Sequence, residues 1–271
     1  MIRGKDATLV AILNTILDEE PETQDHIANK LGISRRYVAK LIKPLIDDGI
    51  ITHPYIINMN KISKLEIADK IDKPLDKIIE LYGKMANNVL YNLDKTYTSL
   101  KNRDIEKAKG VIAQDYRLNK MEDEIAISIK MNNLKYLSME QSMELSIIAA
   151  NIERCGDYVS NIAEEIVNGL IITDNLSEDI DYLFEIITKM FNYAINRIEN
   201  NSQNYEIYDL ERELHNTIEK ILEKISSEKC DNKNIQQYIQ FGMFLKDVER
   251  FGDRSIKIFE AARDFYHNMK I

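Results

Sequence analysis

Apolar residues recur every three or four positions along most of the chain, the spacing of one face of an α-helix. The pattern predicts a first helix over residues 7–18. Two later stretches each predict three long helices, and the second set is expected over 176–200, 203–229 and 232–269. All four prolines lie within the first 74 residues, so no proline interrupts the later helices. The sequence therefore predicts a mainly α-helical protein with a short N-terminal part.

The first long set begins at Pro74, a residue suited to the first position of a helix. Its breaks are expected near residues 102–104 and 132–133, which leaves three helices of roughly 28 to 32 residues. The pattern restarts around 173–175 for the second set. Antiparallel helices joined by short loops form bundles, so we expect two tandem three-helix bundles.

The N-terminal part has the pattern of a helix-turn-helix. Thr23 is expected to cap a short helix that Gly32 ends, and Ser34 to cap the helix that follows. From Ile33 to Ile46 there are four basic residues and no acidic one, although residues 1–60 are near neutral. A helix with a basic front and an apolar back suits the DNA major groove. The residues predicted to contact DNA are Ser34, Arg35, Arg36, Tyr37, Lys40 and Lys43.

Two short strands are expected after Gly49, over residues 50–52 and 56–58. With them, the stretch QDHIANKLGISRRYVAKLIKPLIDDGII resembles winged-helix transcription regulators over about 60 residues. Two features depart from that pattern. Pro44 is expected to kink the recognition helix, and the wing carries neither Lys nor Arg. The alternative is a small domain that mediates protein contacts or dimerisation.

One motif occurs twice in the helical part, as ERCGD at 153–157 and ERFGD at 249–253. The copies are 96 residues apart, which indicates a duplicated three-helix unit. On a helix, the Glu and Asp of each copy lie one turn apart and repel each other unless a cation is near. Glycine costs about 1 kcal/mol in a helix interior, so its repetition suggests that another backbone or a ligand comes close.

The doubled motif, with NIAE after the first copy, resembles the phosphate-uptake regulator family PhoU over roughly residues 70–271. The resemblance implies two similar three-helix bundles whose carboxylate-rich faces hold iron or zinc clusters. It also implies a role in restraining phosphate transport and signalling. The chain is thus expected to have three domains, a winged helix at 1–62 and bundles at 63–172 and 173–271.

The resemblance also implies acidic pairs on the middle helix of each bundle. The interval from Asp115 to Glu153 is 38 residues, and that from Asp209 to Glu249 is 40. Asn119 departs from a full carboxylate set, so the second set is the better metal candidate. The predicted ligands are Asp115, Asn119, Glu153, Asp157, Asp209, Glu213, Glu249 and Asp253. The alternative is a set of solvated acids, or acids that pair with Arg154 and Arg250.

The remaining features limit the function classes. There is no Gly-rich phosphate loop, no Gly-x-Ser-x-Gly and no Glu-x-x-His, so an enzyme is not expected. The four histidines are expected to be surface or satisfied core residues. A net charge of −9 argues against non-specific coating of nucleic acid. With only two cysteines and no run near 18 apolar residues, we expect a cytoplasmic protein without membrane insertion.

These observations predict a phosphate-responsive transcription regulator, whose DNA-binding head is controlled by a PhoU-like helical sensor. A homodimer is expected, because recognition helices usually act in pairs. In the alternative interpretation, the protein restrains a phosphate transporter or sensor kinase without binding DNA.

Overall fold

The computed structural model describes residues 4–19, 21–52, 55–62, 65–67, 74–130, 137–226 and 235–268. Its contacts divide the chain into two compact units, a smaller N-terminal unit and a larger helical unit that begins at Ile78. Both of the expected three-helix sets contribute to the larger unit. The mainly α-helical class predicted from the sequence is confirmed.

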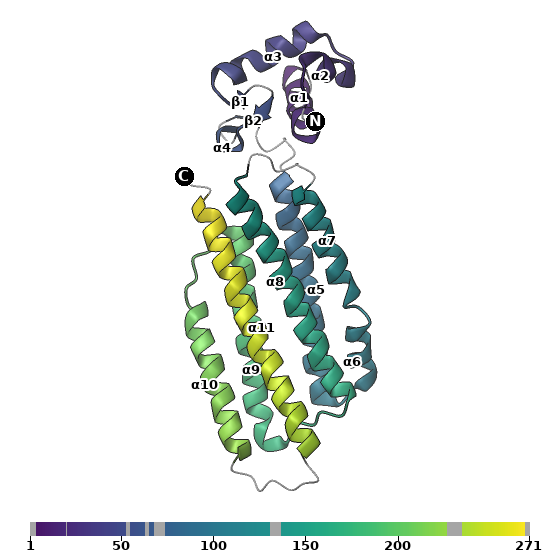
Figure 1. Ribbon diagram of the computed structural model, residues 1–271, viewed down its shortest axis with the longest axis vertical. Coiled ribbons are helices and arrows are strands. Elements are labelled where there is room, and N and C mark those ends of the chain that lie inside the picture. Colours follow the sequence, from purple (N-terminus) through teal and green to yellow (C-terminus); the bar gives the residue numbers. More distant parts are fainter. Residues whose placement is uncertain are drawn as a thin grey trace. The chain divides into compact units, whose positions relative to one another are not determined.

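The N-terminal unit is a winged helix-turn-helix (Figure 1). Its two strands pair antiparallel, with Ile51 opposite Ile57 and Thr52 opposite Ile56. Part of the expected wing, residues 53 and 54, lies outside the described residues. The elements are α1 (Lys5–Glu19), α2 (Gln24–Leu31), α3 (Arg35–Asp47), β1 (Ile51–Thr52), β2 (Ile56–Ile57) and α4 (Met59–Ile62).

Three caps predicted from the sequence fix both ends of α2 and the start of α3. The Thr23 hydroxyl accepts a hydrogen bond from the His26 amide at 3.2 Å, and the Ser34 hydroxyl accepts one from the Tyr37 amide at 3.3 Å. Gly32 ends α2 with a φ of 64°, in the left-handed region that glycine adopts without strain. Because each cap satisfies end groups of its helix locally, the turn is fixed within a few residues.

The apolar back of α3 builds the core of this unit. Val38, Leu41, Ile42 and Leu45 are buried against the first helices, where Ile12, Leu13, Ile16 and Ile27 are also buried. Helix α3 continues past Pro44 as far as Asp47, so the proline does not end it. The opposite face of α3 is left to solvent.

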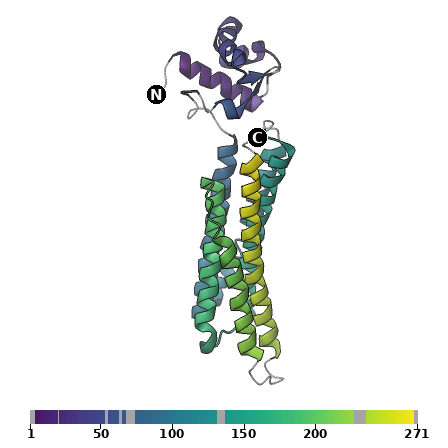
Figure 2. The same cartoon turned by 90° about the vertical axis from the view of Figure 1, so that its left-hand side faces the viewer.

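In the helical unit, long helices run alongside one another (Figures 1 and 2). The first repeat comprises α5 to α8 and the second α9 to α11. Their bounds are α5 (Pro74–Asn102), α6 (Ile105–Ile112), α7 (Tyr116–Lys130), α8 (Met139–Val167), η2 (Asp174–Leu176), α9 (Ser177–Asn200), α10 (Ile207–Ser226) and α11 (Ile235–Asn268).

Most of the predicted helix boundaries are confirmed. Helix α5 ends at the expected break, where Asp104 caps α6 by accepting a hydrogen bond from the Lys107 amide at 3.0 Å. Helix α9 begins just after the expected restart at 173–175. The break expected at 132–133 lies outside the described residues.

The middle helix of the first repeat was predicted as one piece, and this is wrong. A turn at residues 113–115 separates α6 from α7. The buried residues Val111 and Leu118 are seven positions apart, so the apolar periodicity runs through the break and does not mark it.

The last helices of the two repeats, α8 and α11, pack along each other at the centre of the unit. The glycines of the doubled motif, Gly156 in α8 and Gly252 in α11, are both buried. A Cβ at Gly156 would overlap with a methyl group of Leu118, and one at Gly252 would overlap with a methyl group of Leu214. Both glycines are thus closely packed, but the group that approaches each of them is a leucine side chain and not the backbone or ligand expected from the sequence.

Within the described ranges, no helix combines the length and apolarity needed to cross a membrane.

Candidate functional site

The outer face of α3 is a basic surface. The polar residues that lie exposed along it are Ser34, Arg35, Arg36, Lys40 and Lys43. Arg35 lies 3.5 Å from Asp25, but both side chains are more than half exposed, so this pair is weak. Tyr37 differs from the other predicted contacts because it is half-buried and packs against the core. The capping bonds hold the start of this helix, where base contacts are made in helix-turn-helix proteins.

In the first repeat, the charges of four carboxyl groups act on one another, and we call them the first acidic group: Asp115, Glu122, Glu153 and Asp157. Three of them were predicted. Asp115 is held in place by Ser160, whose hydroxyl donates to it at 3.0 Å. Asn119, also predicted, is exposed. Glu122 was missed, although it lies one helical turn beyond Asn119 in the sequence.

Burial and mutual repulsion change the protonation of this group. Burial, followed by the charges of Asp157, Glu122 and Asp115, raises the pKa of Glu153 to about 7. The pKa of Asp157 is also raised, mainly by burial and then by the charge of Asp115. Arg154 opposes both shifts without cancelling them. Carboxyls that repel one another in this way favour either a bound proton or a cation between them.

This pKa predicts that the protein is destabilised as pH rises. In the unfolded chain Glu153 ionises near 4.5, whereas in the folded protein it ionises near 7. Between these values the folded state holds a proton that the unfolded state has lost, so the free energy of unfolding falls with rising pH. We expect a loss of about 1 kcal/mol from this group, after allowing for its partial exposure to solvent.

Urea unfolding across this pH window, with a chelator present, measures the effect. Glu153→Gln should make the decline shallower and be more stable than the wild type above pH 7. The matched control is Glu164→Gln, which changes an exposed carboxyl on the same helix and should retain the decline. Equal slopes in the wild type and Glu153→Gln would contradict the prediction.

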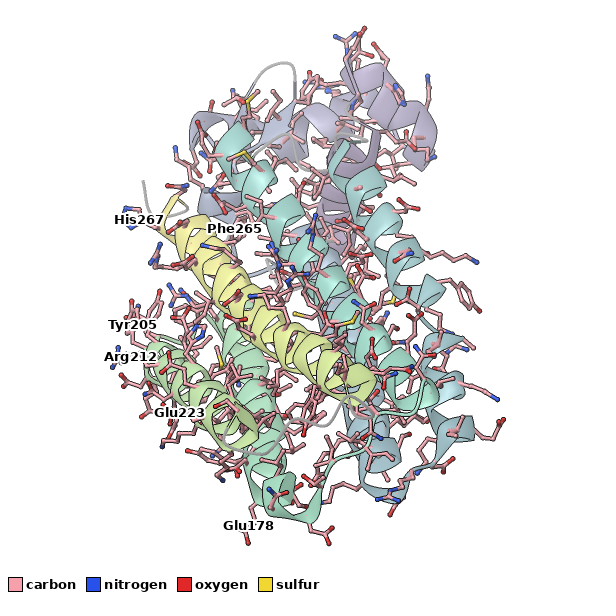
Figure 3. All side chains as sticks on the ribbon, turned by 60° about the horizontal axis from the view of Figure 1, so that its bottom comes forward. Glu178, Tyr205, Arg212, Glu223, Phe265 and His267 are labelled. Carbon is pink, nitrogen blue, oxygen red and sulfur yellow. The ribbon has the colours of Figure 1, made fainter. Side chains whose placement is uncertain are left out.

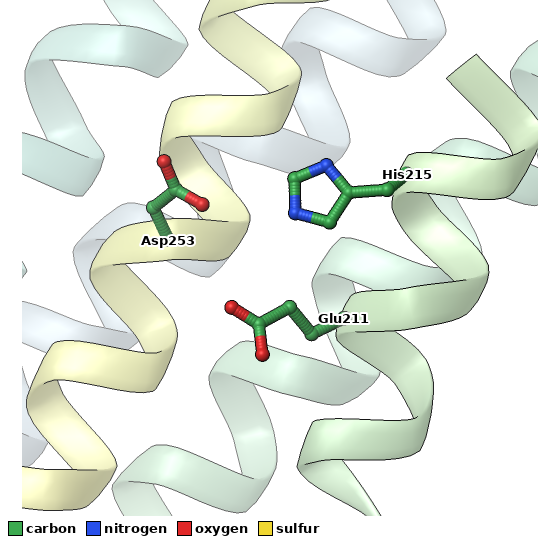
Figure 4. A group of neighbouring side chains, drawn as sticks. All are labelled: Glu211, His215 and Asp253. Atoms are coloured by element: carbon green, nitrogen blue, oxygen red, sulfur yellow. The ribbon is translucent and has the colours of Figure 1, made fainter. Parts of the chain in front are cut away.

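In the second repeat, three side chains converge, and we call them the second group: Glu211, His215 and Asp253. Each offers one ligand atom, and these atoms all lie within 4.8 Å of one another (Figure 4). Glu249 borders the group, with its carboxylate 3.6 Å from Nδ1 of His215 and 2.5 Å from Nζ of Lys246. All three members are half-buried, so an ion held there would be partly shielded from water.

Two residues predicted for this site lie elsewhere. Asp209 pairs with Arg212, and Glu213 accepts a hydrogen bond from Tyr182 of α9. Figure 3 shows Arg212 on the outer side of α10, away from α11. The residues of α10 that face α11 are instead Glu211 and His215, two positions later than predicted. Of the predicted ligands in this repeat, Asp253 lies in the group and Glu249 beside it.

The repeat itself carried a signal for the missed residues. Leu118 meets Gly156, and Leu214 meets Gly252, with 96 residues between equivalent positions. The same offset takes Asp115 to position 211 and Asn119 to position 215. The doubled motif therefore points to Glu211 and His215, provided that its offset is also applied to the middle helix.

The comparisons with known proteins agree with both units. The family model of the PhoU domain matches residues 82–166, and that of a winged helix-turn-helix DNA-binding domain matches residues 5–52. An uncharacterised protein of Methanocaldococcus jannaschii is 46% identical over 269 residues, which cover 99% of this chain and 93% of the relative. The chain belongs to the PhoU family.

Solved PhoU structures share the fold of the helical unit. The crystal structure of PhoU from Pseudomonas aeruginosa has a TM-score of 0.64 at 16% identity, over 72% of this chain and 97% of that one. PhoU from Streptococcus pneumoniae, described as a phosphate transport system regulatory protein, has a TM-score of 0.60 at 16% identity. This match covers 72% of the present chain and 94% of the Streptococcus pneumoniae chain.

The two matched domains indicate a PhoU-type regulator with a DNA-binding head. Both matched families are regulatory rather than enzymatic. The helix-turn-helix match includes α3, and the basic outer face of that helix agrees with DNA binding.

Proposed function

We propose that this PhoU-family protein is a phosphate-responsive transcription regulator, acting in the cytoplasm on genes of phosphate uptake. The observation that carries the proposal is the exposed basic face of α3, held by its caps in the same chain as a PhoU-type unit. The winged helix binds DNA, and the helical unit responds to phosphate status. The protein acts as a homodimer, which presents two recognition helices to two half-sites.

The carboxylate groups of the helical unit are proposed to hold iron or zinc. The chemistry of the donors fits, since the second group combines an imidazole with two carboxylates on facing helices. Asp115, Glu153 and Asp157 supply oxygen donors in the first repeat. A bound ion would neutralise these acids and offer positive charge to phosphate.

A change in the packing of the helical unit is proposed to alter how the two heads fit their half-sites. Typical couplings between sites of this kind are about 1–3 kcal/mol, or roughly 5–150-fold in affinity. Phosphate should therefore change the dissociation constant for the operator by a factor in this range.

Fluorescence anisotropy with labelled DNA fragments tests the proposal. Fragments upstream of the protein's own gene and of phosphate-transport genes are titrated at two salt concentrations, with and without phosphate. We expect one fragment to bind two chains tightly, with affinity that falls as salt rises and shifts with phosphate. Equal, weak binding to every fragment would overturn the proposal and leave a phosphate transporter or sensor kinase as the partner.

A further inference from the structure

The two repeats offer different donor atoms at equivalent positions. The 96-residue offset relates Asp115 to Glu211, Asn119 to His215, Glu122 to Ile218, Glu153 to Glu249 and Asp157 to Asp253. The first repeat thus has an extra carboxylate at Glu122, where the second has an apolar residue. The second repeat has an imidazole where the first has an exposed amide. Only the second group contains a nitrogen donor.

The geometry of the second group suits that nitrogen. Glu211 and His215 lie one turn apart on α10 and face Asp253 on α11, and Figure 4 shows one ring nitrogen turned toward the two carboxylates. The Glu249 carboxylate lies 3.6 Å from Nδ1, on the other nitrogen. Ligating histidines usually donate their second N–H to such an acceptor, which fixes the orientation of the ring.

The register of α10 is set by packing beside the group. Leu214 precedes His215 and is fully buried against Gly252, which precedes Asp253. This contact fixes the two helices against each other at the height of the group. Apolar packing between α10 and α11 therefore fixes the positions of the donor side chains, in addition to the interactions between the donors themselves.

We propose that His215 makes the second group selective for borderline transition ions such as Zn²⁺ and Fe²⁺ over Mg²⁺ and Ca²⁺, and that the first group lacks this preference. Imidazole favours zinc, iron, cobalt and nickel, whereas sets of oxygen atoms alone suit magnesium, calcium and manganese. The inference rests on the proposed metal role of the helical unit and is independent of DNA binding.

Cobalt titration of the tag-free, full-length, chelator-stripped protein in excess Mg²⁺ tests the inference. Co²⁺ reports its ligands through visible absorption, and competition with Zn²⁺ gives the relative affinity. We expect one tightly bound Co²⁺ per chain. His215→Asn, which installs the residue of the first repeat, should weaken Co²⁺ binding at least about 10–100-fold, since even indirect partners of a ligand have effects of this size.

Two further variants sharpen the test. Glu213→Gln alters an acid two positions away on the same helix, which contacts Tyr182 instead, and should leave Co²⁺ binding unchanged. Asn119→His places an imidazole at the equivalent position of the first repeat and should let that repeat also retain Co²⁺ in excess Mg²⁺. Circular dichroism melts check that each variant is folded.

The outcomes separate this inference from the proposed function. Unchanged affinity and absorption in His215→Asn would overturn the selectivity role of His215. Absence of Co²⁺ and Zn²⁺ binding in the wild type would overturn both the inference and the proposed metal role. Metal binding as expected, combined with failure to recognise any DNA fragment, would overturn the regulatory proposal alone.

Discussion

Reversing two charges at the start of α3, in Arg35→Glu/Arg36→Glu, is expected to abolish specific DNA binding. Both side chains are exposed at the N-terminal end of α3. In helix-turn-helix proteins, this end of the recognition helix contacts the base edges in the major groove. Loss of one base-reading arginine costs about 1–3 kcal/mol, so the pair should cost about 2–6 kcal/mol, and the new carboxylates also repel phosphate. Anisotropy against the preferred fragment measures the loss.

Stability should change little in this variant. The ion pair of Arg35 with Asp25 is exposed and contributes about 0–1 kcal/mol. The core of the head is built by the opposite face of α3, and the capping hydroxyl of Ser34 is untouched. A melting temperature close to that of the wild type would show that the loss of binding reflects lost contacts.

The matched control carries the same change in net charge elsewhere. Lys84→Glu/Lys109→Glu reverses two exposed lysines of the helical unit, on α5 and α6. Long-range repulsion of DNA would weaken binding equally in both double variants. If the control binds the fragment as poorly as the α3 variant, the basic face of α3 is not the DNA surface.

The head could be predicted closely because its signals are local. Thr23, Gly32 and Ser34 act within one helical turn of themselves, and each residue type is suited to its own cap. The apolar back of α3 followed directly from periodicity. Tyr37 was placed among the DNA contacts, yet it packs partly against the core, which a charge pattern cannot reveal.

The helical unit was harder to predict, because contacts between helices decide which residues face one another. The register of α10 against α11 depends on how Leu214 fits beside Gly252, and this contact lies between segments far apart in the chain. The one-turn spacing of acids and the family resemblance selected Asp209 and Glu213, because acidic residues are frequent on that helix. The true neighbours of Asp253 include His215, which looked like an isolated surface histidine in the sequence.

The first acidic group shows the same limit. Glu122 joins it from a different turn of α7 than Asn119, and the family pattern gave no reason to include it. Burial of Glu153, which dominates its raised pKa, depends on the packing of α8 in the bundle. Sequence reasoning therefore identified the motif but not the electrostatic state of its carboxyls.

Gly252→Ala is expected to destabilise the protein, although alanine is the better helix former. The new methyl group would overlap with the side chain of Leu214, which is fully buried. Overpacking of this kind costs about 1–3 kcal/mol, measured as a lower free energy of unfolding in urea. Gly242→Ala on the same helix meets nothing within 4 Å and should instead stabilise by about 0.5–1 kcal/mol.

The opposite signs of these two changes separate packing from helix propensity. Leu214→Ala should relieve the overlap, so Gly252→Ala/Leu214→Ala should lose less stability than the sum of the single variants. Because the same contact holds α10 against α11, Gly252→Ala should also weaken Co²⁺ binding by the second group while leaving every ligand in place. Stability in Gly252→Ala equal to or above the wild type would show that Leu214 rearranges freely. The packing of the repeat would then not be what positions its donors.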